Sequence, residues 1–227
     1  MATYDLEEQE QLAEMKAWWK QYGNLLVSLL TAASIGVIAW QGWNWYQRNQ
    51  TAQASMIYSV LQKSALEKDS QRLKAASGEL LEKFGGTTYA PLGALIAAKA
   101  MFDAGDAKTA KVQLTWVVEH GKDELRDLAR LRLAAVLLDE KSYDEALKQL
   151  DGNIAAGFFV RFAESRGDVF GAQGKMAEAR KAYQAALAKL DEVDQTGKGK
   201  NSLQDKQANA PYRETLQQKL DSLGERK

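Results

Sequence analysis

The fold is decided by residues 167–186, which have the sequence GDVFGAQGKMAEARKAYQAA. Small residues, aromatic rings and a glycine turn alternate in it at helical spacing: Gly167, Phe170, Gly174, Ala179, Tyr183 and Ala186. A small residue lets a neighbouring helix approach closely, and an aromatic ring fills the remaining gap. The stretch therefore predicts two antiparallel helices, over 158–173 and 176–190, joined by a short turn.

The same frame occurs twice more upstream. The second unit has Ala134, Leu137, Lys141, Ala146 and Leu150, and the first has Ala98, Met101, Gly105, Ala110 and Leu114. The turn positions Gly105, Lys141 and Gly174 are 36 and 33 residues apart. This spacing is typical of tetratricopeptide repeats, whose period is about 34 residues. Three units in register predict an all-α solenoid, in which each helical pair packs against its neighbours.

Helix is also predicted for the rest of residues 48–190, which are rich in alanine and lack the apolar–polar alternation of a strand. The expected helices cover residues 51–67, 70–84, 92–104, 107–119, 122–140 and 143–150. The helix over 122–140 has apolar residues on two sides, which is typical of a helix between two neighbours. We therefore expect helical hairpins and tetratricopeptide-like repeats over 48–190.

A membrane anchor is predicted over residues 21–47. No residue between Lys20 and Arg48 is charged, and the apolar stretch is long enough to cross a hydrocarbon core that needs roughly 20 residues. Aromatic residues at both ends form the belts expected at the two interfaces: Trp18, Trp19, Trp40, Trp43, Trp45 and Tyr46. A buried core helix would not concentrate tryptophan in this way. A cleaved signal peptide is also disfavoured, because bulky tryptophans occupy the place of a small-residue cleavage site.

Two further features of the anchor bear on its orientation and contacts. Lys16 and Lys20 precede it and only Arg48 follows closely, so the positive-inside rule favours a cytoplasmic N-terminus by a small margin. Residues 1–20 would then be a short acidic cytoplasmic tail. Ser28, Ala32 and Gly36 place small side chains on one helix face, which suits close packing against a partner's membrane helix. The alternative is that small residues are simply common in membrane helices.

Past the repeats, residues 191–210 are polar and contain Gly-Lys-Gly-Lys at 197–200. They are expected to form a flexible linker. A phosphate loop is rejected there, because no strand precedes the glycines and no helix start with Ser or Thr follows them. Residues 211–227 are predicted to form a capping helix, with Leu216, Leu220 and Leu223 covering the edge of the last repeat.

The amino-acid composition disfavours most kinds of catalytic and metal-binding site. The chain of 227 residues has no cysteine and one histidine, His120, which excludes thiolate sites and multi-histidine metal sites. Thirty basic residues balance thirty acidic ones, so net charge does not indicate nucleic acid. No nucleophile is paired with a base, and His120 lies at a helix end where it would interact with exposed carbonyls. We expect no enzyme activity, cofactor, metal or small-molecule substrate.

A protein-binding surface is the remaining expectation. The first helix of each hairpin in such a solenoid faces the concave side, which suits a helix or an extended segment of a partner. The frame places the following residues there: Lys99, Phe102, Asp103, Leu128, Leu131, Leu138, Asp139, Arg161, Glu164 and Asp168. The alternative for Leu131 and Leu138 is a place in the core between helices.

In its organisation the chain resembles the YfgM-type ancillary subunits of the bacterial SecYEG translocon. The resemblance is sharpest at 40–46, 89–106 and 130–150, and it is weakest at 191–210, which looks like an insertion. It implies a single-pass inner-membrane protein with its repeat domain in the periplasm. It also implies association with SecYEG and with a membrane-anchored periplasmic chaperone of the prolyl-isomerase type, to which exported chains would pass. A scaffold of another envelope assembly, in division or outer-membrane biogenesis, is the alternative.

Overall fold

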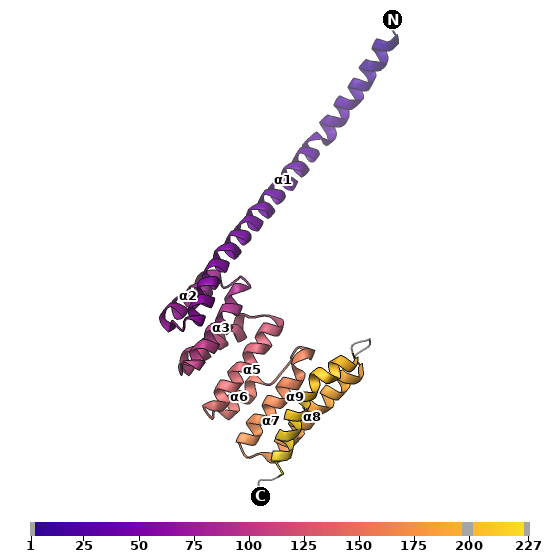
Figure 1. Cartoon of the computed structure of the whole chain (residues 1–227). Helices are drawn as coiled ribbons and strands as arrows, with labels where there is room; N and C mark the ends of the chain where they lie inside the picture. The colour runs from indigo at the N-terminus through magenta and orange to yellow at the C-terminus, as the bar shows by residue number, and fades with distance from the viewer. Residues whose placement is uncertain (1–2, 197–201, 225–227) are drawn as a thin grey trace. The chain divides into compact units, whose positions relative to one another are not determined.

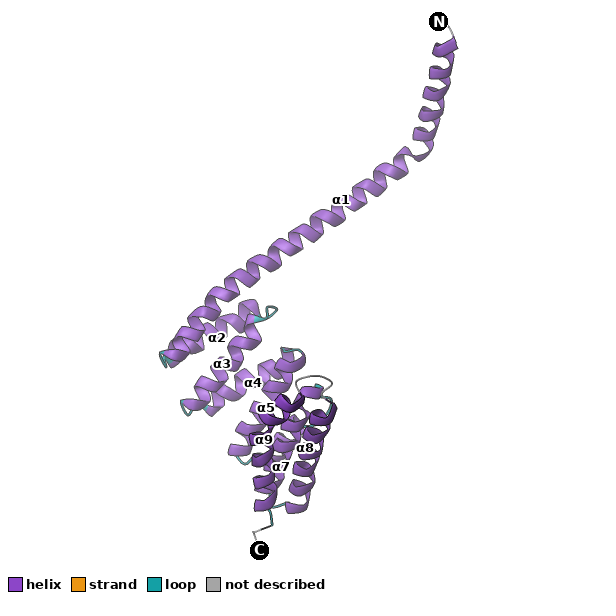
Figure 2. Cartoon of the chain, turned by 45° about the vertical axis from the view of Figure 1, so that its right-hand side comes forward, coloured by secondary structure: helices purple, strands orange, loops and turns teal. Residues whose placement is uncertain are grey.

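The computed structural model describes residues 3–196 and 202–224, and within these ranges the regular structure is entirely helical (Figures 1 and 2). The elements are α1 (Thr3–Leu66), α2 (Ser70–Phe84), α3 (Tyr89–Asp103), α4 (Ala107–His120), α5 (Asp123–Asp139), α6 (Tyr143–Gln149), the short 3₁₀ helix η1 (Ala156–Phe158), α7 (Phe159–Ala172), α8 (Met176–Thr196) and α9 (Ser202–Ser222). The chain divides into two compact units, Met1–Gln53 and Ala54–Lys227.

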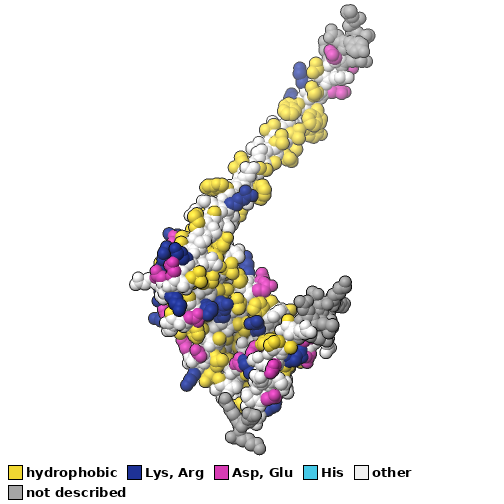
Figure 3. Space-filling view, viewed as in Figure 1, with side chains coloured by type: hydrophobic (Ala, Val, Ile, Leu, Met, Phe, Trp, Pro, Cys, Tyr) yellow, Lys and Arg dark blue, Asp and Glu magenta, His cyan; other side chains and the backbone are white. Residues whose placement is uncertain are grey.

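The first unit is the N-terminal part of α1. Within the described ranges, α1 is the one helix long and apolar enough to cross a membrane. Its large apolar side chains are exposed, as Figure 3 shows in yellow, whereas a core helix of a soluble protein would be mostly buried. The Thr31 and Ser34 hydroxyls donate to the carbonyls of Val27 and Leu30, both at 2.8 Å. These polar groups are therefore satisfied within the helix, as a lipid environment requires.

The second unit contains four helical hairpins closed by the same turn. The turn residues have positive φ: Lys68 (56°), Gly105 (82°), Lys141 (60°) and Gly174 (76°). In each, the next N–H donates to a carbonyl five residues back: Asp69 to Ser64, Asp106 to Met101, Ser142 to Leu137 and Lys175 to Phe170, at 2.8–3.0 Å. This is the Schellman motif that ends a helix with one left-handed residue. The predicted turns at Gly105, Lys141 and Gly174 are confirmed.

The turn at Lys68 adds a hairpin to the three units found in the sequence. The helix expected over 51–67 is the last part of α1, which the turn at Lys68 joins to α2, and both helices contribute side chains to the main core. Its Tyr58 ring lies 5.3 Å from the Tyr89 ring at the start of α3. α3 itself begins at Tyr89, three residues earlier than predicted. The hairpins are therefore α1–α2, α3–α4, α5–α6 and α7–α8, followed by α9.

Close helix packing depends on glycine at two places. A Cβ at Gly167 would lie 2.4 Å from the Tyr183 ring, and one at Gly93 would lie 2.6 Å from Leu80 Cδ1. Neither distance is possible without displacing the neighbour, so both helices approach because the side chain is absent. At Gly167 the small residue admits the neighbouring helix and an aromatic ring fills the gap, as the repeat frame predicts.

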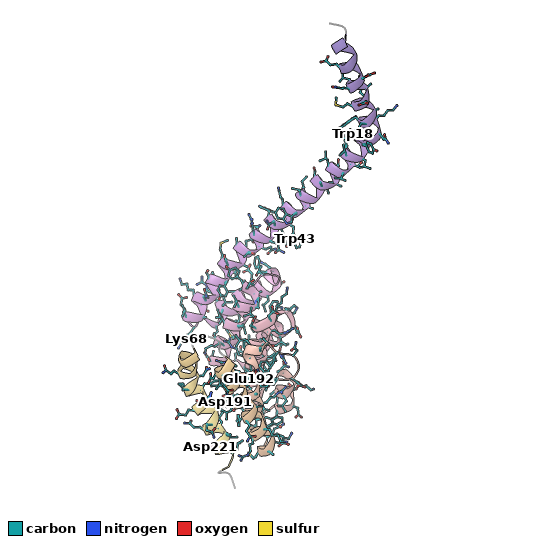
Figure 4. All side chains as sticks on the ribbon, turned by 90° about the vertical axis from the view of Figure 1, so that its right-hand side faces the viewer. Trp18, Trp43, Lys68, Asp191, Glu192 and Asp221 are labelled. Atoms are coloured by element: carbon teal, nitrogen blue, oxygen red, sulfur yellow. The ribbon has the colours of Figure 1, made fainter. Side chains whose placement is uncertain are left out.

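The polar linker expected over 191–210 is wrong for most of its length. α8 extends to Thr196 and α9 begins at Ser202; the Gly-Lys-Gly-Lys at 197–200 lies outside the described residues. The polar side chains hold the two helices together, since Asp194 accepts from Asn209 at 2.8 Å and from Arg213 at 2.6 Å. Arg213 also pairs with Asp191, which is labelled in Figure 4. Pro211 accordingly lies inside α9 and not at its start.

Candidate partner-binding surface

The first helices of the hairpins, namely the end of α1, α3, α5 and α7, follow one another through the second unit, with α9 after α7 (Figure 1). Contacts between them are partly polar. Arg132 on α5 donates to the Leu95 carbonyl on α3 at 3.2 Å. Lys219 on α9 donates to Glu164 and Asp168 on α7, each at 2.7 Å. The residues predicted to bind a partner lie on α3, α5 and α7 of this series.

The α3 residues of the predicted surface are accessible. Lys99 and Asp103 form an exposed ion pair at 2.7 Å, one helical turn apart. The Phe102 ring beside them is 37% exposed, which is unusual for a phenylalanine in a packed solenoid. These three side chains could contact a partner without any change in the fold.

The α5 residues divide between core and surface. Leu131 is only 9% exposed and belongs to the main hydrophobic core, so its assignment to a partner-binding surface is wrong and the alternative, a place between helices, is correct. Leu128 and Leu138 are partly buried against the same core, and Asp139 is exposed. The reason is that α5 packs against α4, α6 and α7, which leaves little of its apolar surface uncovered.

On α7, the expected surface is occupied by the chain itself. Arg161 is exposed, but Glu164 accepts from the Tyr212 hydroxyl at 2.6 Å and Asp168 from the Tyr183 hydroxyl at 2.8 Å, in addition to their bonds with Lys219. Assigning Glu164 and Asp168 to a free partner-binding surface is therefore wrong. They bind α9, whose Leu216 is fully buried beside Tyr183 and Ala186 of α8, so a helix covers the last hairpin where the cap over 211–227 was expected.

The pKa shifts of the side chains that join α7, α8 and α9 follow from their burial and hydrogen bonds. Burial raises the pKa of the Tyr212 phenol, and the Glu164 carboxylate raises it further. Burial also raises the pKa of Tyr183, helped by Asp168. For Lys219, burial acts to lower the pKa, but hydrogen bonds to Asp168 and Glu164 outweigh it and the pKa is raised. Lys219 is therefore held in its charged form against two carboxylates.

A groove of about 530 Å³ lies between the last turns of α1 and α3, and we call it the α1–α3 groove. Leu66 and Ile96 contribute apolar surface to it, above the buried Leu95. Lys99 and Asp103 line it as well, and Arg132 of α5 completes it. The groove thus combines part of the predicted surface with two residues, Leu66 and Arg132, that the prediction missed.

A signal for Arg132 was present in the repeat frame. It lies nine residues before its turn residue, where the neighbouring units have Ile96 and Ser165. A charged residue at a position that is otherwise small or apolar stands out once the units are aligned. Leu66 carries no such signal, because the repeat frame in the sequence begins with the unit whose turn residue is Gly105.

Sequence reasoning also missed a buried ion pair on α5. Asp127 is 1% exposed and Arg130 8% exposed, and their side chains are 3.2 Å apart. Arg130 donates to the carbonyls of Gln149, Asp151 and Asn153, while Asp127 accepts from the Ala155 amide at 2.7 Å. The pair therefore fixes the connector between α6 and η1 by satisfying its backbone groups.

The anchor residues retain the geometry that their predicted roles need. Ser28, Ala32 and Gly36 are exposed, and a Cβ at Gly36 would meet no atom within 4 Å. The belt residues are exposed too, and Figure 4 labels Trp18 and Trp43. Helix packing by the small residues and interfacial placement of the aromatics stay predictions.

His120 has a local partner. Its Nδ1 lies 3.0 Å from the Trp116 carbonyl oxygen, and its ring stacks on the Trp116 ring at 4.6 Å between centroids. This agrees with the predicted helix-end position, because α4 ends at His120. In the part of the chain that the structure describes, no three histidine or carboxylate side chains are grouped as metal ligands.

A protein family and a bacterial relative are similar to this chain over nearly its whole length. The family described as "Tetratricopeptide repeat-like domain" matches residues 16–225. A Neisseria gonorrhoeae protein named "Ancillary SecYEG translocon subunit" is 34% identical over 96% of this chain and 98% of its own length. A Haemophilus influenzae protein of the same name is 28% identical over 85% of this chain and 95% of its own length. Among solved structures, MamA from Desulfovibrio magneticus RS-1 matches 76% of this chain and 93% of its own, with 17% identity and a TM-score of 0.49.

Proposed function

The chain belongs to the family of ancillary SecYEG translocon subunits with a tetratricopeptide repeat-like domain, and from this membership we propose that it is a non-enzymatic scaffold and co-chaperone of protein export. The observation that carries the proposal is the 34% identity along 96% of the chain. Such a match includes both the apolar helix and the repeats. It therefore supports the same division of labour, in which a membrane anchor carries a polypeptide-binding domain.

The proposed location is the bacterial inner membrane, crossed once by α1. The orientation that we propose has a cytoplasmic N-terminus and a periplasmic repeat domain. Lys16 and Lys20 before the apolar stretch support it, against Arg48 alone close after it. A domain without cysteine does not depend on disulfide formation, so it is compatible with the periplasm.

Two partners are proposed. The first is SecYEG, which the small-residue face of Ser28, Ala32 and Gly36 could contact within the bilayer. The second is a membrane-anchored periplasmic chaperone of the prolyl-isomerase type, which the repeat domain could contact through the exposed α3 surface around Phe102. A protein that holds both partners would link the exit of an exported chain to its periplasmic chaperones. The resemblance to YfgM-type subunits supports the second partner, and the family name supports the first.

Photocrosslinking in living cells tests the partners and protease protection tests the topology. A photoreactive amino acid at Ala32 is expected to crosslink to SecYEG, and one at Phe102 to the periplasmic chaperone. In spheroplasts, external protease should digest the repeat domain and leave the N-terminal tail intact. Protection of the repeat domain from protease would contradict the orientation. Absence of SecYEG crosslinks from Ala32, and from the same probe at Ser28 and Gly36, would contradict the translocon contact.

A further inference from the structure

We infer that the α1–α3 groove binds a partner segment in which an Asp or Glu side chain lies next to aliphatic side chains. This inference rests on the proposed function, because it takes the repeat domain to bind polypeptides. It adds the location of one docking site and the chemistry of its occupant.

The apolar part of the occupant is indicated by Leu66. Its side chain is 85% exposed, more than any other large hydrophobic side chain in the described residues. It lies in the groove with Leu95 and Ile96. The groove volume of about 530 Å³ falls within the 300–1,000 Å³ typical of ligand pockets, enough for a few side chains. Exposed leucine at a concave site gains from contact with aliphatic groups of a partner.

The charged part of the occupant is indicated by Arg132. Lys99 and Asp103 neutralise each other at 2.7 Å, so they leave no net charge in the groove. Arg132 donates only to the Leu95 carbonyl at 3.2 Å, and no carboxylate among the described residues forms an ion pair with it. Burial lowers the pKa of the guanidinium, which reflects lost hydration. An incoming carboxylate would compensate for that loss with a charge-assisted hydrogen bond.

Two other charged groups of the repeat domain are already paired within the chain. Glu164 and Asp168 on α7 are bound by Lys219 of α9. On α4, Lys111 pairs with Glu140 at 2.5 Å. The α7–α9 contact also shows the kind of interaction expected in the α1–α3 groove with the charges reversed. There a buried leucine, Leu216, accompanies a cation that meets carboxylates.

The test is peptide binding to the full-length protein in nanodiscs, followed by fluorescence anisotropy. The probe is a fluorescein-labelled, amide-terminated peptide with the sequence GSLLELISG, and its matched partner has Gln in place of Glu. We expect the Glu peptide to bind at least tenfold more tightly, because a hydrogen bond between charged groups is worth about a factor of ten or more. Arg132→Gln should abolish this preference and Arg132→Lys should retain most of it. Arg126→Gln, an exposed change on the same helix, is the control and should leave the preference intact.

Leu66→Ser tests the apolar wall without disturbing the core. It should weaken the binding of both peptides several-fold, whereas Val112→Ser, a change at another exposed aliphatic side chain on α4, should weaken neither. Equal affinity of the wild-type protein for the Glu and Gln peptides would overturn the inference, as would an equal loss in Arg126→Gln. A Gln peptide with a free C-terminal carboxylate that binds more tightly than the Glu peptide would also overturn it, because the cation would then receive a chain terminus.

Failure of this inference can be separated from failure of the proposed function by purifying SecYEG with the same variants. Normal co-purification without any preference for the Glu peptide would overturn the groove assignment alone. The Arg132-dependent preference without co-purification would support the groove assignment and count against the proposed function.

Discussion

At the scale of single residues, two of the hairpin turns have a lysine in a backbone conformation that favours glycine. Gly105 and Gly174 adopt positive φ without a steric penalty, whereas Lys68 and Lys141 adopt it with a Cβ. The left-handed conformation costs a non-glycine residue about 1–2 kcal/mol. Turns built on lysine are therefore maintained by the packing of the helices that they join.

Replacing one of these lysines by glycine should stabilise the protein. We expect Lys141→Gly to raise the free energy of unfolding by about 0.5 kcal/mol, because relief of the left-handed strain exceeds the added chain entropy. Gly174→Ala, the reverse change in an equivalent turn, should lower it by about 1 kcal/mol. Urea unfolding followed by circular dichroism measures both. Destabilisation by Lys141→Gly would show that the lysine side chain contributes more than its backbone costs.

Asp106 gives the fold a defined acid sensitivity. It accepts from Lys74 at 2.5 Å, and it caps α4 by accepting from the Thr109 amide at 3.0 Å. The Lys74 ammonium, followed by the Thr109 bonds, lowers the pKa of Asp106 below its ordinary value of 3.8. A depressed pKa means that the carboxylate stabilises the fold above the unfolded-state pKa and stops doing so as the pH falls through the folded-state pKa.

We therefore expect the free energy of unfolding to fall as the pH is lowered below about 4, with part of that fall caused by protonation of Asp106. Asp106→Asn should reduce the slope of stability against pH in this range, and Lys74→Met should move the acid transition to higher pH. Urea unfolding at a series of pH values between 2 and 7 measures the slope. An unchanged slope in Asp106→Asn would mean that other carboxylates account for the acid sensitivity.

At the scale of helices and hairpins, the sequence predicts features that depend on contacts within one hairpin and misses those that depend on contacts between hairpins. The hairpin of α7 and α8 was predicted, because Gly167, Gly174 and Tyr183 act within one unit. For Leu131 the sequence leaves a surface and a core position as alternatives, since the spacing within α5 gives its faces but not which neighbouring helices cover them. The end of α8 was missed for a related reason. Polar residues such as Asp194 and Asn209 indicate a linker when taken singly, and only their pairing across two helices shows otherwise.

The same dependence on contacts between helices makes α9 separable from the rest of the repeat domain. Among the side chains of α9 that the structure describes, Leu216 is the fully buried apolar one, in a small cluster with Tyr183, Ala186 and Leu190. We expect Leu216→Ala to destabilise the docking of α9 by about 2–4 kcal/mol, as typical for a buried leucine. Hydrogen exchange should accelerate in α9 and not in α3, and Leu223→Ala, which alters a partly buried leucine, should have a smaller effect. Equal acceleration throughout would show that α9 and the hairpins unfold as one unit.

At the scale of the whole molecule, the apolar helix and the repeat domain contact their partners in different environments, the first in lipid and the second in water. In lipid, apolar area gives no preference for a partner helix, so association depends on close packing and polar contacts. In water, the repeat domain can use apolar burial and charge together, as in the α1–α3 groove. Binding of a second partner to an already tethered protein is then intramolecular, which raises its effective concentration.

Changes confined to the anchor should therefore affect one partner and spare the other. We expect Ser28→Leu combined with Gly36→Leu to reduce co-purification with SecYEG, because two added isobutyl groups hold a partner helix away from the small-residue face. Ser34→Leu with Val37→Leu, on the opposite face, is the matched control and should leave co-purification unchanged. Carbonate extraction should show all variants in the membrane, and crosslinking from Phe102 to the periplasmic chaperone should persist. If the stripe variant co-purifies with SecYEG as the control does, the small residues do not form the docking face, and the translocon contact must be sought in the repeat domain.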